Sequence, residues 1–298
     1  MTFIDLFSGI GGFRLGMELA GHQCLGHCEI DNYANVSYNM MHDVKEGEWF
    51  ESDINSIDPR NVPDCDCRCF GFPCQDISVA GKQTGFAGKR SSLFFAVTRL
   101  LREKENKPNY LFIENVKNFF SVNGGWDFLS ALAELDEIGY DVEWQLLNSK
   151  HFGVPQNRER VFIIGHLRCR CTRKVFPITG IIGKALKQII GNMQTTTQVE
   201  VRSVLTPDRA EKRQNGRRIK DDGEDMFTLT SQDRHGVMLG SRIRRLTPRE
   251  CFRLQGFPDE YFDRASSVTS DSQLYKQAGN SVTVNVIYEI AKKLEVIA

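Results

Sequence analysis

The sequence predicts an α/β protein, with a doubly wound, mostly parallel sheet, helices on both faces, and a small irregular lobe. Strand-like and helix-like apolar patterns alternate through the first half, which is typical of strands joined by crossover helices. After Gly165 this pattern breaks, and residues 167–245 have few long periodic segments. With 298 residues and 41% hydrophobic side chains, the chain can bury the core that such a sheet needs.

The expected elements can be placed in order along the chain. Short apolar runs predict strands over residues 2–7, 23–29, 110–113, 142–147 and 161–164. Longer amphipathic runs predict helices over residues 12–20, 92–102 and 126–138. A last helix, which we expect to pack back onto the first lobe, is predicted by the spacing of Val282, Val286, Ile290 and Leu294.

Charge is distributed unevenly, although the chain has 38 basic and 38 acidic side chains and a net charge of zero. Residues 150–249 hold 21 basic and 9 acidic side chains, a net charge of +12, and the remainder carries −12. Such asymmetry predicts one lobe that binds a polyanion, rather than an evenly solvated surface.

The nine cysteines are an odd number for a disulfide framework, and a reducing compartment would not keep them paired. Cys65, Cys67 and Cys69 alternate, which puts their side chains on one face of a strand. Since C-x-C-x-C is not a usual zinc spacing, and free cysteine packs as a small hydrophobic residue, we favour buried packing over a metal site.

The chain shows no sign of a membrane or secretory segment. No stretch reaches the roughly 18 uninterrupted apolar residues that a membrane span needs. Residues 1–7 read directly as a strand and lack the basic start of a signal peptide. We therefore expect a cytoplasmic protein with no membrane partner.

A glycine turn, Phe7-Ser8-Gly9-Ile10-Gly11-Gly12, leads from the first strand into the first helix. Glycines at such a turn let the backbone approach a ligand closely. The third glycine of a G-x-G-x-x-G dinucleotide fingerprint would fall on Arg14, which disfavours an NAD oxidoreductase.

Two acids after the next strands suit a nucleoside without a pyrophosphate. Glu29 stands about 20 residues after the glycines, where a carboxylate can accept from ribose hydroxyls. Asp53 follows the expected end of a third strand and can accept from an adenine amino group.

Further motifs follow in a fixed order. Cys74 stands in Gly-Phe-Pro-Cys-Gln, and Glu114 follows in Phe-Ile-Glu-Asn-Val at the end of an apolar strand. Arg158 and Arg160 lie in Gln-Asn-Arg-Glu-Arg, and Gln-Ala-Gly-Asn-Ser-Val begins at Gln277. Together with the glycine turn, these motifs closely resemble the DNA cytosine-5 methyltransferases of bacteria and phages. The resemblance covers residues 3–166 and 244–298.

The resemblance implies a Rossmann-like fold that binds S-adenosylmethionine, with Phe7 against the adenine. Donors at the start of the last helix would suit the methionine carboxylate. The implied cofactor-binding residues are Asp5, Phe7, Gly9, Gly11, Gly12, Glu29, Ile30, Asp53, Ile54, Pro73, Asn280, Ser281 and Val282.

The implied chemistry is covalent catalysis on cytosine. Cys74 would add as a thiolate to C6 and so make C5 electron-rich enough to accept a methyl group. Because a free thiol is mostly protonated at neutral pH, we expect electropositive surroundings or concerted deprotonation. Glu114, as a protonated acid, could donate to N3 of the base. Arg158 is expected to contact the cytosine O2, and it or Arg160 would organise the charge around the site.

The target base must leave the duplex stack before C5 and C6 can be reached. Residues 76–91 suit a loop that closes over it, with glycines for flexibility and cations for phosphates. The expected DNA-binding residues are Gln75, Ser78, Lys82, Arg90, Thr228, Thr230, Gln232, Arg234 and Arg244. We expect a catalytic, cofactor-binding domain over 1–166 plus 272–298 and a target-recognition domain over 167–271.

Other functions stay open at this point. A branch of the same family methylates transfer RNA, although the distinct basic lobe favours a specific short site in duplex DNA. A protein that has lost catalysis and only docks partners is disfavoured by the intact motifs. A short lobe suggests a monomer, which would associate with the nucleoid when bound to DNA. A restriction endonuclease acting separately would be one partner, and a solitary or phage-borne enzyme is the other expectation.

Overall fold

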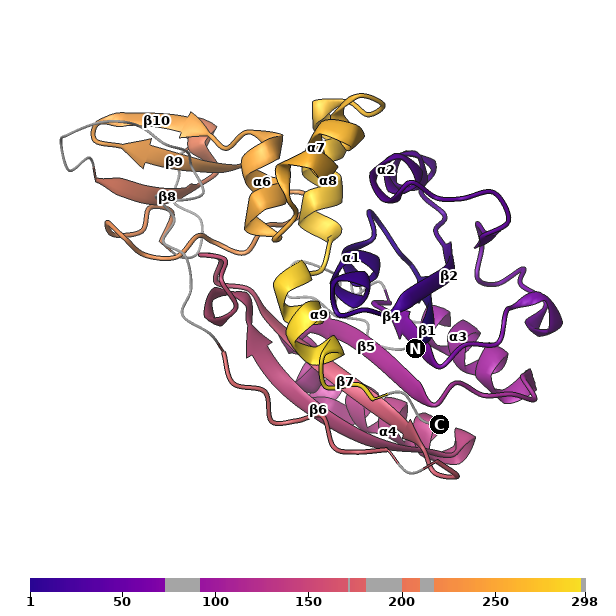
Figure 1. The fold of residues 1–298 in the computed structure, drawn as a ribbon. Helices are drawn as coiled ribbons and strands as arrows, with labels where there is room; N and C mark the ends of the chain where they lie inside the picture. Colours follow the sequence, from indigo (N-terminus) through magenta and orange to yellow (C-terminus); the bar gives the residue numbers. More distant parts are fainter. Residues whose placement is uncertain (73–91, 171, 181–199, 210–216, 296–298) are drawn as a thin grey trace.

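The computed structural model describes residues 1–72, 92–170, 172–180, 200–209 and 217–295. Its centre is a seven-stranded sheet of order β3-β2-β1-β4-β5-β7-β6 (Figure 1). The strands are β1 (Thr2–Leu6), β2 (Gln23–Cys28), β3 (Trp49–Glu51), β4 (Cys67–Phe70), β5 (Tyr110–Val116), β6 (Tyr140–Asn148) and β7 (Glu159–Leu167). The first five are parallel, and β7 runs antiparallel to both β5 and β6. The predicted mostly parallel α/β sheet is confirmed.

Helices cover both faces of this sheet. On one face, α3 (Ser92–Glu103) and α4 (Trp126–Ile138) pack on a core that includes Ile4 and Leu6. On the other, α1 (Gly12–Leu19) and α9 (Val284–Ala291) pack on a core that includes Phe3. The central strands are apolar on both sides because helices shield both faces from water.

The alternating cysteines of β4 point into the second of these cores. Cys67 and Cys69 are both fully buried there, and their sulfur atoms are 3.8 Å apart. Cys65 precedes the strand and is half-buried, and Cys169 is exposed. The interpretation of Cys67 and Cys69 as small buried residues is confirmed. Within the described ranges no group of three or more His, Cys, Asp or Glu could hold a metal ion.

A second lobe stands beside the first (Figure 1). Its antiparallel sheet has the order β10-β9-β8, from β8 (Val201–Leu205), β9 (His235–Leu239) and β10 (Arg242–Arg245). Helices α6 (Pro248–Leu254), α7 (Asp259–Ser266) and α8 (Asp271–Asn280) lie between the two sheets. One apolar core joins β8, β9 and these helices to Ile10 and Leu15 of the first lobe. The proposed domain boundaries therefore stay a prediction, since this core crosses them.

Several elements differ from the sequence-based expectation. Strands β5, β6 and β7 are longer than predicted, and α2 (Asn32–His42) was not predicted. Gly279 and Asn280 end α8 instead of preceding a single last helix, and Thr283 caps the separate helix α9. As predicted, this last helix packs back onto the first lobe, with Ile287 of α9 against α1 at Gly16. Among the helices that the structure describes, none has the length and apolar character to cross a bilayer.

Candidate active site

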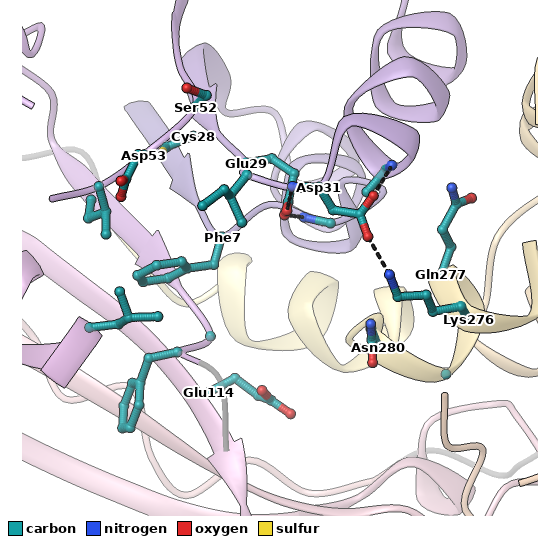
Figure 2. A pocket seen from close by; sticks show the side chains of 18 of the residues that line it. Phe7, Cys28, Glu29, Asp31, Ser52, Asp53, Glu114, Lys276, Gln277 and Asn280 are labelled. Carbon is teal, nitrogen blue, oxygen red and sulfur yellow. Dashed lines mark hydrogen bonds and ion pairs between the residues drawn. The ribbon is translucent and has the colours of Figure 1, made fainter. Parts of the chain in front are cut away.

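A cavity of about 350 Å³ opens at the carboxyl edge of the parallel strands (Figure 2). Ligands of open α/β sheets bind at this edge because the loops that follow neighbouring strands meet there. Its described lining comes from the segments after β1 to β4, from the end of β5, from the start of β7 and from α8. Of the predicted residues, the lining includes Phe7, Gly9, Glu29, Ile30, Asp53, Ile54, Glu114, Arg158, Arg160 and Asn280.

The glycine turn after β1 has an unusual backbone. Phe7 has φ 54°, Gly9 φ 55° and Gly11 φ 76°, all in the left-handed region that glycine adopts most readily. At Gly11 a Cβ would come within 2.1 Å of the His42 ring, whose Nε2 donates to the carbonyl of Ile10 at 3.0 Å. The turn therefore rests directly on His42, a contact that the sequence did not indicate.

Glu29 fixes the turn from the neighbouring strand. Its carboxylate accepts from the backbone N–H of Gly9 at 2.7 Å and from that of Asp31 at 2.7 Å (Figure 2). Burial raises the pKa of Glu29 above its ordinary value, and the two backbone hydrogen bonds oppose this shift. Each carboxylate oxygen has a second lone pair, so Glu29 can still accept from ribose hydroxyls.

Asp53 lies on the cavity wall after β3. One carboxylate oxygen accepts from the backbone and side-chain N–H groups of Asn55, both at 2.9 Å. The other oxygen has no such contact among the described residues, and it can accept from a bound amino group. Ile54 beside it is buried, whereas Ile30 is 70% exposed at the mouth.

Glu114 and Arg160 form an ion pair in the wall of the same cavity. Arg160 Nε lies 2.9 Å from Glu114 Oε1, with both side chains less than one-sixth exposed. They come together because β5 and β7 are antiparallel neighbours, with Val116 opposite Arg160 in the register. Gly71 leaves room for the acid, since a Cβ there would lie 3.1 Å from Glu114 Oε2.

Arg158 has a different environment, although it is only two residues away. It is 3% exposed, and its guanidinium donates to the backbone carbonyls of Leu229 at 2.7 Å, Ser281 at 2.8 Å and Gly279 at 3.3 Å. These contacts join β7 to the second lobe and to the end of α8. The expected contact of Arg158 with a cytosine O2 stays a prediction.

Other predicted cofactor residues lie behind the cavity. Asp5 is fully buried in β1, and burial raises its pKa well above the usual range. Gly12 packs against Ser281 and Val282, because a Cβ there would lie within 2.8 Å of both side chains. These residues position the turn, and only Asn280 of the C-terminal motif's predicted residues is in the described lining.

The structure adds lining residues that were not among the predicted site residues. Lys276 Nζ lies 2.6 Å from Asp31 Oδ2 (Figure 2). Gln277 Nε2 donates to the carbonyl of Tyr33 at 3.0 Å. These contacts tie α8 to the start of α2 across the mouth of the cavity. The only signal in the sequence is their position, since Gln277 begins the C-terminal motif and Lys276 stands directly before it.

Some of the predicted residues lie outside the described part of the chain. They are Pro73, Cys74, Gln75, Ser78, Lys82 and Arg90. The described chain reaches Phe72, whose backbone carbonyl accepts from Asn115 Nδ2 at 3.4 Å. The segment that carries the predicted nucleophile therefore begins at the cavity wall, next to β5.

The predicted DNA-binding residues of the second lobe range from half-buried (Thr228, Thr230 and Arg244) to exposed. Thr228 Oγ1 donates to the carbonyl of Asn157 at 2.5 Å, and Thr230 Oγ1 donates to Asp233 at 2.9 Å. Gln232 is exposed. Arg234 pairs with Asp208, and Arg244 pairs with the buried Glu250, which is part of the capping box of α6.

Comparison with solved structures shows the fold. The Dnmt2 methyltransferase of S. pombe superposes with a TM-score of 0.70 over 97% of this chain and 96% of that one, at 20% identity. A prophage-encoded putative DNA modification methyltransferase from E. coli gives a TM-score of 0.71 over 98% of both chains, also at 20% identity.

Comparison with known sequences shows the family. The model of the C-5 cytosine-specific DNA methylases matches residues 1–221 and 170–296. The orphan methyltransferase M.SPRI of Bacillus phage SPR is 33% identical, over 99% of this chain and 97% of its own length. The type II methyltransferase M.HhaI of Haemophilus parahaemolyticus is 35% identical, over 98% and 93%. The chain belongs to the C-5 cytosine-specific DNA methylase family and is a DNA (cytosine-5-)-methyltransferase.

Proposed function

We propose that this enzyme transfers a methyl group from S-adenosylmethionine to C5 of a cytosine flipped out of a specific short sequence in duplex DNA. The family and the fold imply this donor and this substrate. The observation that carries the proposal is one shared cavity, which brings the Glu114–Arg160 pair together with the turn at Phe7 and Gly9. An acid for the base and a site for a nucleoside thus face the same space.

The residues of the cavity fit the proposed cofactor. Glu29 has lone pairs left for ribose hydroxyls, Asp53 offers an oxygen to the adenine amino group, and Phe7 offers an apolar face to the ring. The C-terminal end of α8 brings Asn280 to the opposite side. When bound, S-adenosylmethionine supplies an electrophilic methyl group on its sulfonium sulfur.

The side chains of the enzyme act on the base. The thiolate of Cys74 forms a bond to C6, and the electron pair of the C5–C6 double bond makes C5 nucleophilic. Glu114, once protonated, donates to N3 and so favours this addition. After C5 has accepted the methyl group, a base removes the C5 proton, the double bond re-forms, and the thiolate leaves. We assign no side chain to this last base.

The two arginines divide the remaining work in this proposal. Arg160 is paired with Glu114 in the cavity wall, so its guanidinium is the one poised to contact the O2 edge of a base that Glu114 binds. The guanidinium of Arg158 is occupied by three backbone carbonyls. This environment favours a positioning role for Arg158.

Recognition of DNA is assigned to the second lobe. The half-buried Thr230 and the exposed Gln232 and Arg234 would read or position the duplex, and residues 76–91 would close over the flipped base. A monomer in the cytoplasm, bound to the nucleoid through DNA, fits this arrangement. A separate restriction endonuclease as partner also remains a proposal.

A covalent trap tests the proposed chemistry. Fluorine cannot leave C5 as a proton does, so duplex containing 5-fluorocytosine and S-adenosylmethionine should give an adduct that survives denaturing gel electrophoresis. Cys74→Ser should abolish both this adduct and methyl transfer while leaving DNA binding largely intact. The matched control is Cys169→Ser, which removes an exposed thiol and should retain both. Turnover by Cys74→Ser at the level of the unchanged enzyme would refute covalent catalysis through this residue.

A further inference from the structure

Arg158 is bound on three sides by backbone carbonyls from separate parts of the chain. Leu229 lies 71 residues away in the second lobe, whereas Gly279 and Ser281 lie 121 and 123 residues away at the junction of α8 and α9. A guanidinium presents several N–H donors in one plane and stays charged, so it can hold three acceptors at once. With only 3% of the residue exposed, water cannot replace these acceptors at low cost.

The segments joined by Arg158 also contact each other directly. A Cβ on Gly279 would lie 2.3 Å from the carbonyl carbon of Thr230 and 2.5 Å from the backbone nitrogen of Ser231. Only glycine allows the two backbones to approach this closely. Gly279 lines the cofactor cavity, and it also lines a second cavity of about 460 Å³ formed largely by residues 229–235. It is therefore part of the wall between the two cavities.

The chain just before β7 also holds residues 228–234, here called the recognition segment. Gln156 is fully buried, its Oε1 accepts from the backbone of Leu229 at 2.9 Å, and its Nε2 donates to the carbonyl of Leu254 at 2.8 Å. The carbonyl of Asn157 accepts from Thr228 Oγ1 at 2.5 Å. The recognition segment is thus hydrogen-bonded to Gln156, Asn157 and Arg158 through the neighbouring residues Thr228 and Leu229. Movement of this segment would displace the carbonyl of Leu229, which is an acceptor of Arg158.

We propose that Arg158 couples DNA binding to cofactor binding, as a positioning residue that holds the recognition segment and the α8–α9 junction in one arrangement. The inference rests on the proposed function, in which residues 230–234 meet DNA and Asn280 meets the cofactor. DNA that orders the recognition segment fixes the carbonyl of Leu229, and through Arg158 it fixes those of Gly279 and Ser281. Coupling of this kind is reciprocal, so the cofactor must tighten DNA binding by the same factor.

The test measures the affinity for S-adenosylhomocysteine by calorimetry, with and without a duplex that carries the methylated sequence found by bisulfite sequencing. In the unchanged enzyme, DNA should tighten this affinity at least about fivefold, the lower end of common coupling factors. Arg158→Lys keeps the charge but cannot span three carbonyls. The ratio of the affinity with DNA to the affinity without DNA should therefore fall to about one. If DNA instead tightened cofactor binding through a direct contact between the cofactor and the flipped base, the ratio would stay unchanged in Arg158→Lys.

Two further variants make the outcome decisive. Gly279→Ala forces the backbones of Thr230 and Gly279 apart while leaving the Arg158 side chain itself unchanged, and it should also lower the ratio. Arg168→Lys is the matched control, since Arg168 pairs with Asp136 and Asp141 in the first lobe, and it should retain the full ratio. A ratio of one in the unchanged enzyme, or a full ratio in folded Arg158→Lys or Gly279→Ala, overturns the proposal. Failure of the 5-fluorocytosine trap would instead count against the proposed function.

Discussion

The charged side chains compared here are buried with fixed partners in the cofactor cavity and exposed to solvent in the second lobe. In the cavity, Glu29 is held by two backbone N–H groups, and Glu114 pairs with Arg160 while both are largely buried. In the second lobe, Arg234 and Arg245 share Asp208 in the open. Buried charged groups with fixed partners are already oriented before a ligand binds, whereas exposed ion pairs are weak and exchange partners readily. Chemistry therefore rests on a rigid site, and DNA contact rests on a surface that can rearrange.

The largest effect is expected from the acid of the cavity. Glu114→Gln keeps the shape but removes the carboxylic proton that would assist attack on the base, so kcat should fall by about 10²- to 10⁴-fold. Binding of S-adenosylhomocysteine should change little, because Glu114 faces the base in this account. The control is Glu159→Gln, which removes an exposed partner of Lys117 beside Arg160 and should retain activity. Near-normal turnover by Glu114→Gln would remove the acid from the mechanism.

The same cavity shows why part of the site could be predicted from sequence. Glu29 and Asp53 follow strands, and the loops after parallel strands meet at one edge, so their position along the chain was enough. Glu114 and Arg160 meet because β5 and β7 are neighbours, which motif order indicated only through the resemblance. The local sequence pattern therefore predicts the site residues that directly follow neighbouring parallel strands.

The rest depended on long-range contacts that no local pattern reveals. Arg158 donates to three backbone carbonyls. Because every residue has a backbone carbonyl, no residue type in the sequence could indicate these acceptors. Helix α2 was missed because its buried face includes Ser37 and His42, and this weakens the apolar period. Residues 167–245 gave no periodic signal because the strands described there, β8 to β10, are only four or five residues long.

A second prediction concerns the cofactor half of the cavity. Glu29→Gln places an amide NH₂ against one of two backbone N–H groups that now lie 2.7 Å from a carboxylate oxygen. An unsatisfied or opposed buried donor costs about 1–3 kcal/mol, so the affinity for S-adenosylhomocysteine should weaken about 5- to 150-fold. Calorimetry measures this change, with the exposed Glu46→Gln as control. Unchanged affinity would separate Glu29 from the cofactor site.

A third prediction uses the histidine behind the glycine turn. Burial lowers the pKa of His42 to about 3, so the unfolded chain takes up its proton first as the pH falls below about 6.5. Stability should therefore decline between about pH 6.5 and 3, with His42 contributing up to about 1.4 kcal/mol per pH unit. His42→Gln keeps a donor for the Ile10 carbonyl but binds no proton, so urea unfolding should show a smaller slope against pH. The exposed His151→Gln should match the unchanged protein, and equal slopes for all three would contradict the assignment.

The smallest effect is expected on the recognition side, at Asp208. Its carboxylate pairs with Arg234 at 2.7 Å and Arg245 at 2.5 Å, and the two arginines hold its pKa below the usual range. In the intact protein, phosphate must displace this acid. Asp208→Asn should therefore tighten binding to generic duplex by up to about fivefold, since exposed ion pairs are weak.

The salt dependence of binding distinguishes this competition from a simple change of net charge. If both arginines become free to bind phosphate, the slope of log affinity against log salt should steepen by up to about 1.8, or roughly 0.9 for each phosphate neutralised. Fluorescence anisotropy over a salt series measures the slope. Asp136→Asn changes the net charge equally, but its partner Arg168 keeps its ion pair with Asp141, so the slope of this variant should stay unchanged. If the two variants gave the same slope, Asp208 would be an ordinary surface acid, and the second lobe would be as fixed before DNA binding as the cavity.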